Sequence, residues 1–91
     1  MSRLSIIRER VRRGDYLVSD HMLHDKMRPL RLTVPDIENA ICSGYIVEQR
    51  KEPLGRQYIV EGPTLDYRVV RIPVRLEAGL AVLITVYVIE E

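Results

Sequence analysis

Two long stretches near the C-terminus that predict β-strands constrain the fold more than any other part of this sequence. Residues 67–76 and 80–89 are rich in β-branched side chains, and Glu77-Ala78-Gly79 separates them. Runs of this kind around a short glycine-containing segment are typical of a β-hairpin. One face of this hairpin is wholly apolar, so helices must cover it.

The register of the hairpin follows if the three intervening residues form the turn. Leu76 then pairs with Leu80, and Arg71 falls opposite Thr85 on the other face. In this register the helix-facing core comprises Val70, Ile72, Val74, Val82, Ile84 and Val86.

The remaining elements follow from capping and breaking residues, such as Gly14 after a first helix and Thr33 before a third. We expect a single domain, 1–91, with helices at 3–13, 19–28 and 34–43 and strands at 45–50, 56–61, 67–76 and 80–89. The predicted fold class is α+β, with N-terminal helices packed on one face of a four-stranded antiparallel sheet.

Pro73 conflicts with an interior strand position because it has no N–H to donate. A turn at 62–66 would pair Glu61 with Tyr67 and Arg56 with Ile72. Pro73 would then lie just beyond the end of the shorter strand, where the missing donor costs little.

Composition indicates a cytoplasmic protein that spans no membrane. No apolar run reaches the length of a membrane span, and the single cysteine, Cys42, excludes an internal disulfide and a cysteine metal cluster. The net charge is +1, but residues 1–31 hold eight basic against four acidic side chains. This asymmetry is a weak signal for nucleic-acid binding, since a surface helix also needs charge to remain soluble.

The segment around two histidines is the best candidate for chemistry. At helical spacing, His21, His24, Asp25 and Arg28 share one face, while Leu23, Met27 and Leu30 share the other. Imidazoles titrate near neutral pH, so this face is a candidate for proton transfer. A solvated helix face that happens to carry two histidines is the alternative, and spacing alone favours it.

A metal site is not expected here, because the spacing lacks the His-Glu-x-x-His form that would make it specific. No other cofactor motif is present either. The remaining chemistry is metal-free cleavage of RNA, with His21 or His24 as base or acid and Tyr87 as proton donor or stacking platform. Arg28, Arg31 and Arg71 would hold the phosphate, although a solvated surface explains each of these residues taken alone.

Several short motifs occur together in a recognisable order. They are Tyr16-Leu-Val-Ser-Asp-His21, Lys26-Met27, Leu32-Thr33, Asp36-Ile37-Glu38, Ala40-Ile41, Gly44-Tyr-Ile-Val-Glu48 and Leu83-Ile84-Thr85-Val86-Tyr87. In this respect the chain resembles the bacterial domain-of-unknown-function family 4258, from Tyr16 onward.

The resemblance implies a compact RelE-like toxin fold and an mRNA endoribonuclease, inhibited by an antitoxin protein from a neighbouring gene. It assigns functional positions to His21, Thr85 and Tyr87. The arginine positions of the family carry over only if Lys26, Arg28 or Arg31 substitutes, and lysine is a poor replacement in a bidentate phosphate contact.

The leading hypothesis is therefore a toxin-like, metal-independent endoribonuclease that acts on RNA. The alternatives are a non-catalytic module that binds protein or nucleic acid, and a degenerate toxin that retains only the fold and its antitoxin surface.

Overall fold

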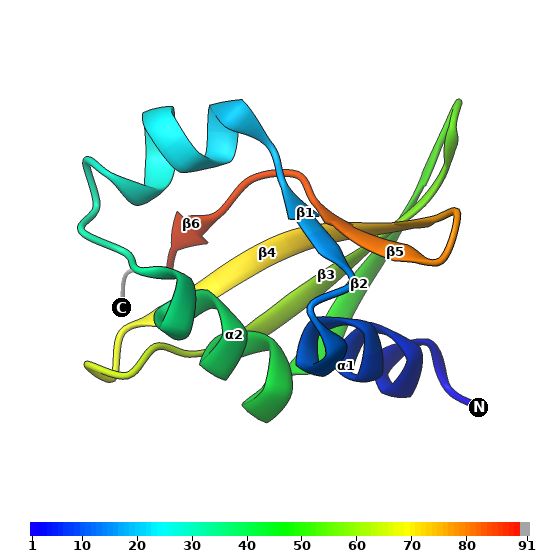
Figure 1. Ribbon diagram of the computed structural model, residues 1–91, viewed down its shortest axis with the longest axis horizontal. Coiled ribbons are helices and arrows are strands. Elements are labelled where there is room, and N and C mark those ends of the chain that lie inside the picture. The colour runs from blue at the N-terminus through cyan, green and yellow to red at the C-terminus, as the bar shows by residue number, and fades with distance from the viewer. Residues whose placement is uncertain (90–91) are drawn as a thin grey trace.

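The computed structural model describes residues 1–89 and shows two layers (Figure 1). The elements, in chain order, are α1 (Arg3–Arg13), β1 (Tyr16–Val18), the π-helix η1 (Met22–Met27), α2 (Val34–Ser43), β2 (Tyr45–Glu52), β3 (Gly55–Pro63), β4 (Val69–Glu77), β5 (Leu80–Leu83) and β6 (Tyr87–Val88). No helix in this part of the chain is both long and apolar enough to cross a bilayer.

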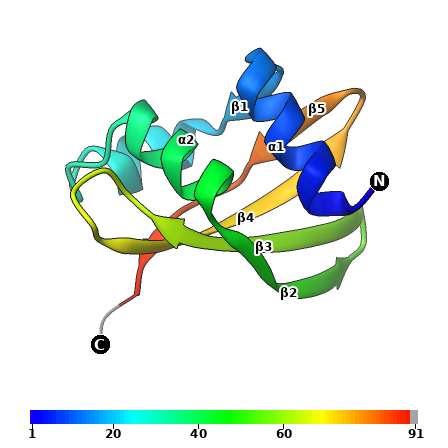
Figure 2. The same cartoon turned by 90° about the horizontal axis from the view of Figure 1, so that it is seen from below.

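All the helices lie on the same side of the sheet, which leaves the other side without a helical layer (Figure 2). Ile7 of α1 and Ile41 of α2 pack with Val60 and Ile72 of the sheet, and all four are fully buried. Burial of these side chains is the main stabilising contribution, at about 1.5–3 kcal/mol each. We call the uncovered side, which carries Glu61, Arg71 and Tyr87, the open face.

The helices α1 and α2 match the predicted boundaries because local capping defines them. The Ser5 N–H donates to Ser2 Oγ at the start of α1. At the start of α2, Asp36 N–H donates to Thr33 Oγ1, and Asp36 Oδ2 accepts from Thr33 N–H at 2.9 Å. This reciprocal capping box satisfies N–H groups that the helix itself leaves unpaired.

The histidine segment is helical, but its period differs from the expected 3.6 residues. The Arg28 N–H donates to the Leu23 carbonyl, five residues back, as in a π-helix. Met22 and Met27, also five residues apart, are buried, whereas Leu23 is only half-buried. Leu23, Met27 and Leu30 all lie on the core side as predicted, but the wider turn also brings Met22, which was not expected there, into the core.

The expectation of a four-stranded antiparallel sheet is wrong: the sheet is six-stranded and mixed. Its order is β1-β5-β4-β3-β2, with β6 pairing β4 beyond the end of β5. Two differences account for the change. The short segment β1 pairs with β5 in parallel, and the predicted strand 80–89 divides into β5 and β6.

The division of that strand lies beside Pro73. The prediction that Pro73 lies past the end of the shorter strand is wrong, because Pro73 is inside β4 and pairs with β3. Pro73 pairs with Ile59, and its carbonyl accepts from Ile84 N–H at 3.0 Å. An antiparallel pair normally exchanges two such bonds, but proline has no N–H to return. The Ile84 carbonyl instead accepts from Ser19 Oγ at 2.7 Å, and the chain leaves the sheet there.

The turn between β4 and β5 contains two residues instead of three. Ala78 and Gly79 have φ of 46° and 82°, as a type I′ turn requires, and Glu77 pairs with Leu80. Because the register shifts by one residue, the predicted Leu76–Leu80 pair is wrong, and Val82 lies opposite Arg75. Ala81 and Leu83 therefore fill the core in place of Val82 and Ile84.

The register between β3 and β4 also differs from the prediction. The Thr64 N–H donates to the Arg68 carbonyl at 2.7 Å and closes the connection after Pro63, so the predicted turn at 62–66 is wrong. Glu61 consequently pairs with Arg71 and not with Tyr67. This pairing is what places Glu61 beside the candidate site.

Candidate functional site

The open face brings two of the candidate residues together. Arg71 of β4 lies directly opposite Tyr87 of β6, and Glu61 of β3 lies opposite Arg71 on its other side. Residues paired across neighbouring strands project from the same face of a sheet. Glu61, Arg71 and Tyr87 therefore form one row across three strands.

Arg71 is fixed in this row by Glu61. The Arg71 Nε donates to Glu61 Oε1 at 2.8 Å, and both side chains are about one-third exposed. This hydrogen bond is the main reason that the pKa of Arg71 is raised above its ordinary value. Arg71 thus remains a cation with a defined orientation and with part of its surface accessible from solvent.

A second ion pair lies on β2 and also projects from the open face. Arg50 Nε donates to Glu48 Oε2, and this bond lowers the pKa of Glu48 below its ordinary value. The charge of Arg71 also lowers the pKa of Glu48, and Tyr87 helps to raise the pKa of both Arg50 and Arg71. These mutual influences place Glu48, Arg50, Arg71 and Tyr87 in one electrostatic cluster, which together with Glu61 we call the open-face cluster.

The two histidines belong to a different surface. His21 Nδ1 lies 3.1 Å from Asp25 Oδ2, and both side chains are more than half exposed. His24 is exposed as well, and within residues 1–89 it makes no side-chain hydrogen bond. Because Met22 and Met27 anchor η1 in the core beneath the helices, the histidines lie on the helix-bearing side (Figure 2). Among residues 1–89, no hydrogen bond or ion pair joins them to Arg71 or Tyr87.

The other predicted binding residues are spread over both surfaces. Lys26 is half-buried and Arg28 exposed on the η1 side, and Arg31 lies exposed in the turn that follows. Thr85 lies between β5 and β6, where its buried Oγ1 has no hydrogen-bond partner among residues 1–89. The structure therefore separates the predicted constellation into a histidine surface and the Arg71–Tyr87 row.

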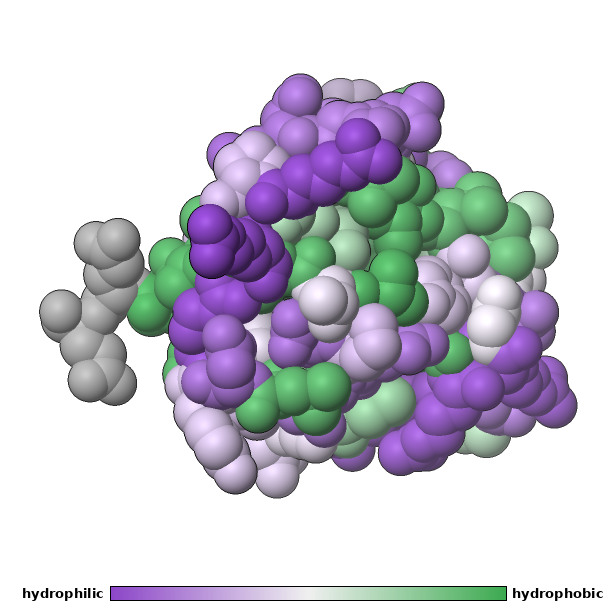
Figure 3. Space-filling model, turned by 60° about the vertical axis from the view of Figure 1, so that its left-hand side comes forward, coloured by the Kyte–Doolittle hydropathy of each residue, from purple (hydrophilic) through white to green (hydrophobic). Residues whose placement is uncertain are grey.

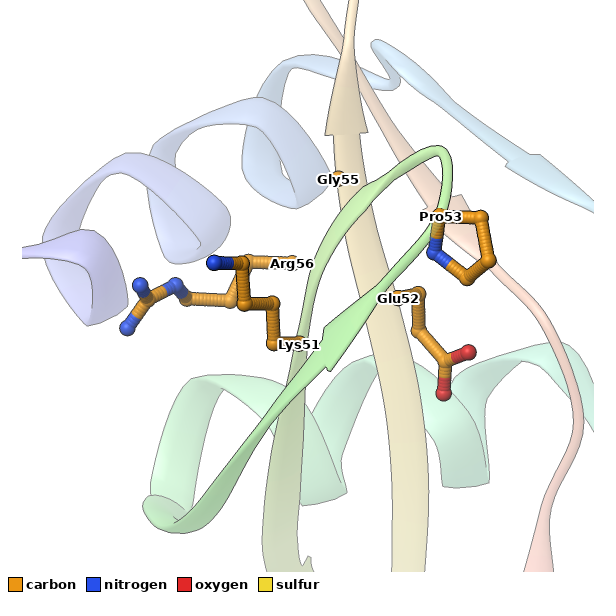
Figure 4. Close-up of a pocket in the computed structure, with 5 residues that line it drawn as sticks. All are labelled: Lys51, Glu52, Pro53, Gly55 and Arg56. Atoms are coloured by element: carbon orange, nitrogen blue, oxygen red, sulfur yellow. The ribbon is translucent and has the colours of Figure 1, made fainter.

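Metal ligation has no evident location. Among the described residues, no group of three or more His, Cys, Asp or Glu side chains lies close enough to hold an ion. A hollow is present at the tip of the β2–β3 hairpin, lined by Lys51, Glu52, Pro53, Gly55 and Arg56 (Figure 4). It contains none of the predicted site residues.

Sequence reasoning missed Glu48, Arg50 and Glu61. Their signal is the polar alternation Glu48-x-Arg50 in β2 and the pairing of Glu61 with Arg71. The alternation is visible in the sequence. The pairing depends on the β3–β4 register, and the predicted register was wrong by several residues.

The fold and the open-face cluster define a small α+β protein whose mixed sheet presents charged and aromatic side chains on a face without helices. The model of a family described as a domain of unknown function, DUF4258, matches residues 18–88. The chain belongs to this family. No match was found among curated proteins or among solved structures.

Proposed function

We propose that the protein is a cytoplasmic, toxin-like endoribonuclease that cleaves RNA at the open-face cluster. We further propose that an antitoxin protein inhibits it. The kinship to RelE-like toxins that the family resemblance implies is part of this proposal. The observation that carries it is the cross-strand pair Arg71–Tyr87, which is flanked by two carboxylates.

The reaction requires three functions that this cluster contains. A base removes the proton of a ribose 2′-hydroxyl, whose oxygen attacks the adjacent phosphorus; the bond to the 5′-oxygen breaks, and an acid protonates that leaving oxygen. Glu48 is the candidate base because it is an exposed carboxylate of the open-face cluster, held in place by its bond from Arg50 Nε. Arg71 offsets the charge that develops on the phosphate, Tyr87 supplies the proton, and Glu61 positions Arg71.

This assignment differs from the one based on the histidines, and mutation separates the two. We expect Arg71→Ala and Tyr87→Phe to lower the cleavage rate of a single-stranded RNA by roughly 10²–10⁴-fold, the range of acid–base catalysts, with activity unchanged in EDTA. The matched variant is His21→Ala, which should fold normally because its side chain is exposed.

The outcomes are distinct. Loss of cleavage in His21→Ala, with Tyr87→Phe fully active, would transfer the chemistry to the histidine surface. A folded wild-type protein that leaves RNA intact would overturn the endoribonuclease proposal.

A second candidate function is a non-catalytic binding module or a degenerate toxin. The observation in its favour is charge balance, because Arg50, Arg71 and Arg75 each have a glutamate partner on the open face. Such pairs weaken phosphate binding, since a phosphate must compete with carboxylates. Binding of RNA or of a protein partner without any cleavage would support this candidate.

The inhibitory partner has a suitable place to bind. Within the described residues, β2 pairs only with β3, so its outer edge offers backbone N–H and C=O groups to another strand. We expect expression of the protein alone to slow growth and co-expression of the neighbouring gene to restore it. Harmless expression of folded, abundant protein would count against the toxin role.

A further inference from the structure

A strained loop pair lies at the end of the molecule opposite α1, where the turn after η1 meets the β3–β4 connection (Figure 1). Arg31 and Tyr67 both have positive φ, 54° and 66° respectively. For side chains other than glycine this conformation costs about 1–2 kcal/mol. Tyr67 is also 90% exposed, so burial of its ring does not offset that cost.

The two loops are nevertheless held firmly together. The Arg68 guanidinium donates to the carbonyls of Leu30 and Arg31 and binds Asp66 at 2.9 Å. On the other side, Asp36 Oδ1 accepts from Leu65 N–H at 3.0 Å. These bonds fix the backbone of the loop that carries Tyr67 beside the turn that carries Arg31. Backbone strain that the surroundings hold in place is common at ligand-binding sites.

The charge of this surface is not balanced, in contrast to the open face. Arg28 and Arg31 lie in one turn, joined by the Arg31 N–H bond to the Arg28 carbonyl, and both side chains are exposed. Neither has an acidic partner within residues 1–89, and the nearby Asp66 is already paired with Arg68. Figure 3 turns this end toward the viewer and shows hydrophilic side chains interspersed with hydrophobic ones.

We propose that Tyr67, Arg28 and Arg31 form a subsite for single-stranded RNA. One base stacks on the exposed Tyr67 ring, and the two arginines contact the neighbouring phosphates. An aromatic platform beside unpaired cations is the arrangement by which proteins bind single strands without reading their sequence. This inference deepens the proposed function, on which its substrate class rests, and adds a binding site at the end of β4 that precedes Arg71.

The test measures binding separately from cleavage. A fluorescent single-stranded oligonucleotide with 2′-O-methyl riboses has no attacking 2′-hydroxyl, so its anisotropy reports binding alone. We expect Tyr67→Ala to weaken binding by about tenfold, whereas Tyr67→Phe, which keeps the ring, binds as the wild type does. Arg28→Gln/Arg31→Gln should weaken binding and reduce the slope of log Kd against log salt by about 0.7 for each lost phosphate contact.

A charge-matched control is available on α1. Arg3 and Arg12 are exposed and lie at the other end of the molecule, so Arg3→Gln/Arg12→Gln removes the same charge without touching the subsite. Wild-type affinity in this control supports the proposal. Equal loss in the control and the Arg28/Arg31 variant, or unchanged binding by Tyr67→Ala, would overturn it.

The remaining outcomes separate this proposal from the proposed function and from another class of partner. If Tyr67→Ala loses binding while ordinary RNA stays uncleaved by the wild type, only the endoribonuclease assignment fails. If Arg71→Ala abolishes cleavage while Tyr67→Ala binds normally, only the subsite fails. Preference of the wild type for an acidic peptide over the oligonucleotide would also overturn it.

Discussion

The Ser19 hydroxyl donates a hydrogen bond of 2.7 Å to the carbonyl of Ile84, in the position that a strand N–H would otherwise occupy. The missing donor belongs to Pro73, whose own carbonyl accepts from Ile84 N–H. Ser19 Oγ also accepts from Met22 N–H at 3.0 Å. One side chain therefore completes the sheet beside the proline and caps the segment that carries the histidines.

Removal of this hydroxyl should destabilise the fold. We expect Ser19→Ala to lower the free energy of unfolding by about 1–3 kcal/mol, because it leaves the Ile84 carbonyl and the Met22 N–H without their partners. Urea denaturation followed by circular dichroism measures the change. Since Pro73→Ala restores a strand N–H, Ser19→Ala should cost less in that background. An equal loss of unfolding free energy in both backgrounds would contradict the idea that the Ser19 hydroxyl replaces the N–H that Pro73 lacks.

Gly62 should tolerate no side chain. A Cβ at this position would lie 2.0 Å from the Ala40 carbonyl oxygen, and that oxygen belongs to the backbone of α2 and cannot rotate away. Gly62→Ala must push α2 off β3 and should cost about 3 kcal/mol or more, the upper end for overpacked cores. A thermal melt gives the measurement. A variant that melts with the wild type would show that the helix lies farther from the sheet.

Replacement of Tyr67 by glycine should stabilise the protein, whereas replacement by alanine should not. Tyr67→Gly removes the steric cost of φ 66° and should raise the free energy of unfolding by about 1 kcal/mol, whereas Tyr67→Ala retains that cost. Chemical denaturation of the two variants side by side provides the comparison. Identical stabilities would indicate that the loop relaxes around Tyr67.

Acid should weaken the junction between α2 and the β3–β4 connection. The Thr33 N–H bond, followed by that from Leu65, holds the pKa of Asp36 below its ordinary value. The ionised carboxylate is therefore more stable in the folded state than in the unfolded state. Its contribution is fully present above the unfolded pKa of about 4 and is lost as the pH falls through the lower folded value.

The measurement for this effect is the free energy of unfolding between about pH 5 and pH 2. The wild type should lose stability more steeply than Asp36→Asn, which has no proton to bind at this position. Parallel pH profiles for the two proteins would exclude Asp36 as the responsible group.

The elements that local contacts define could be predicted from the sequence. The helices at 3–13 and 34–43 were predicted with their observed boundaries, because Ser2 and Thr33 cap them through bonds that span three residues. The strands at 45–50 and 56–61 were also placed, although both are longer in the structure. Val70, Ile72 and Val74 were correctly identified as core because alternation reports the buried face within one unbroken strand, and Val86 was identified as well.

The way in which these elements join depends on contacts between residues far apart in the sequence. The parallel pairing of β1 with β5, the division of the last strand beside Pro73 and the π-helical period of η1 all depend on partners distant in sequence. The register of the strands also depends on distant partners, and a shift of one residue moves every side chain of a strand to the other face. The one-residue shift in β5 and one further residue at the break before β6 together set Arg71 opposite Tyr87 instead of Thr85. The β3–β4 register set Glu61 beside Arg71, so this row of the open-face cluster depends on pairings distant in sequence.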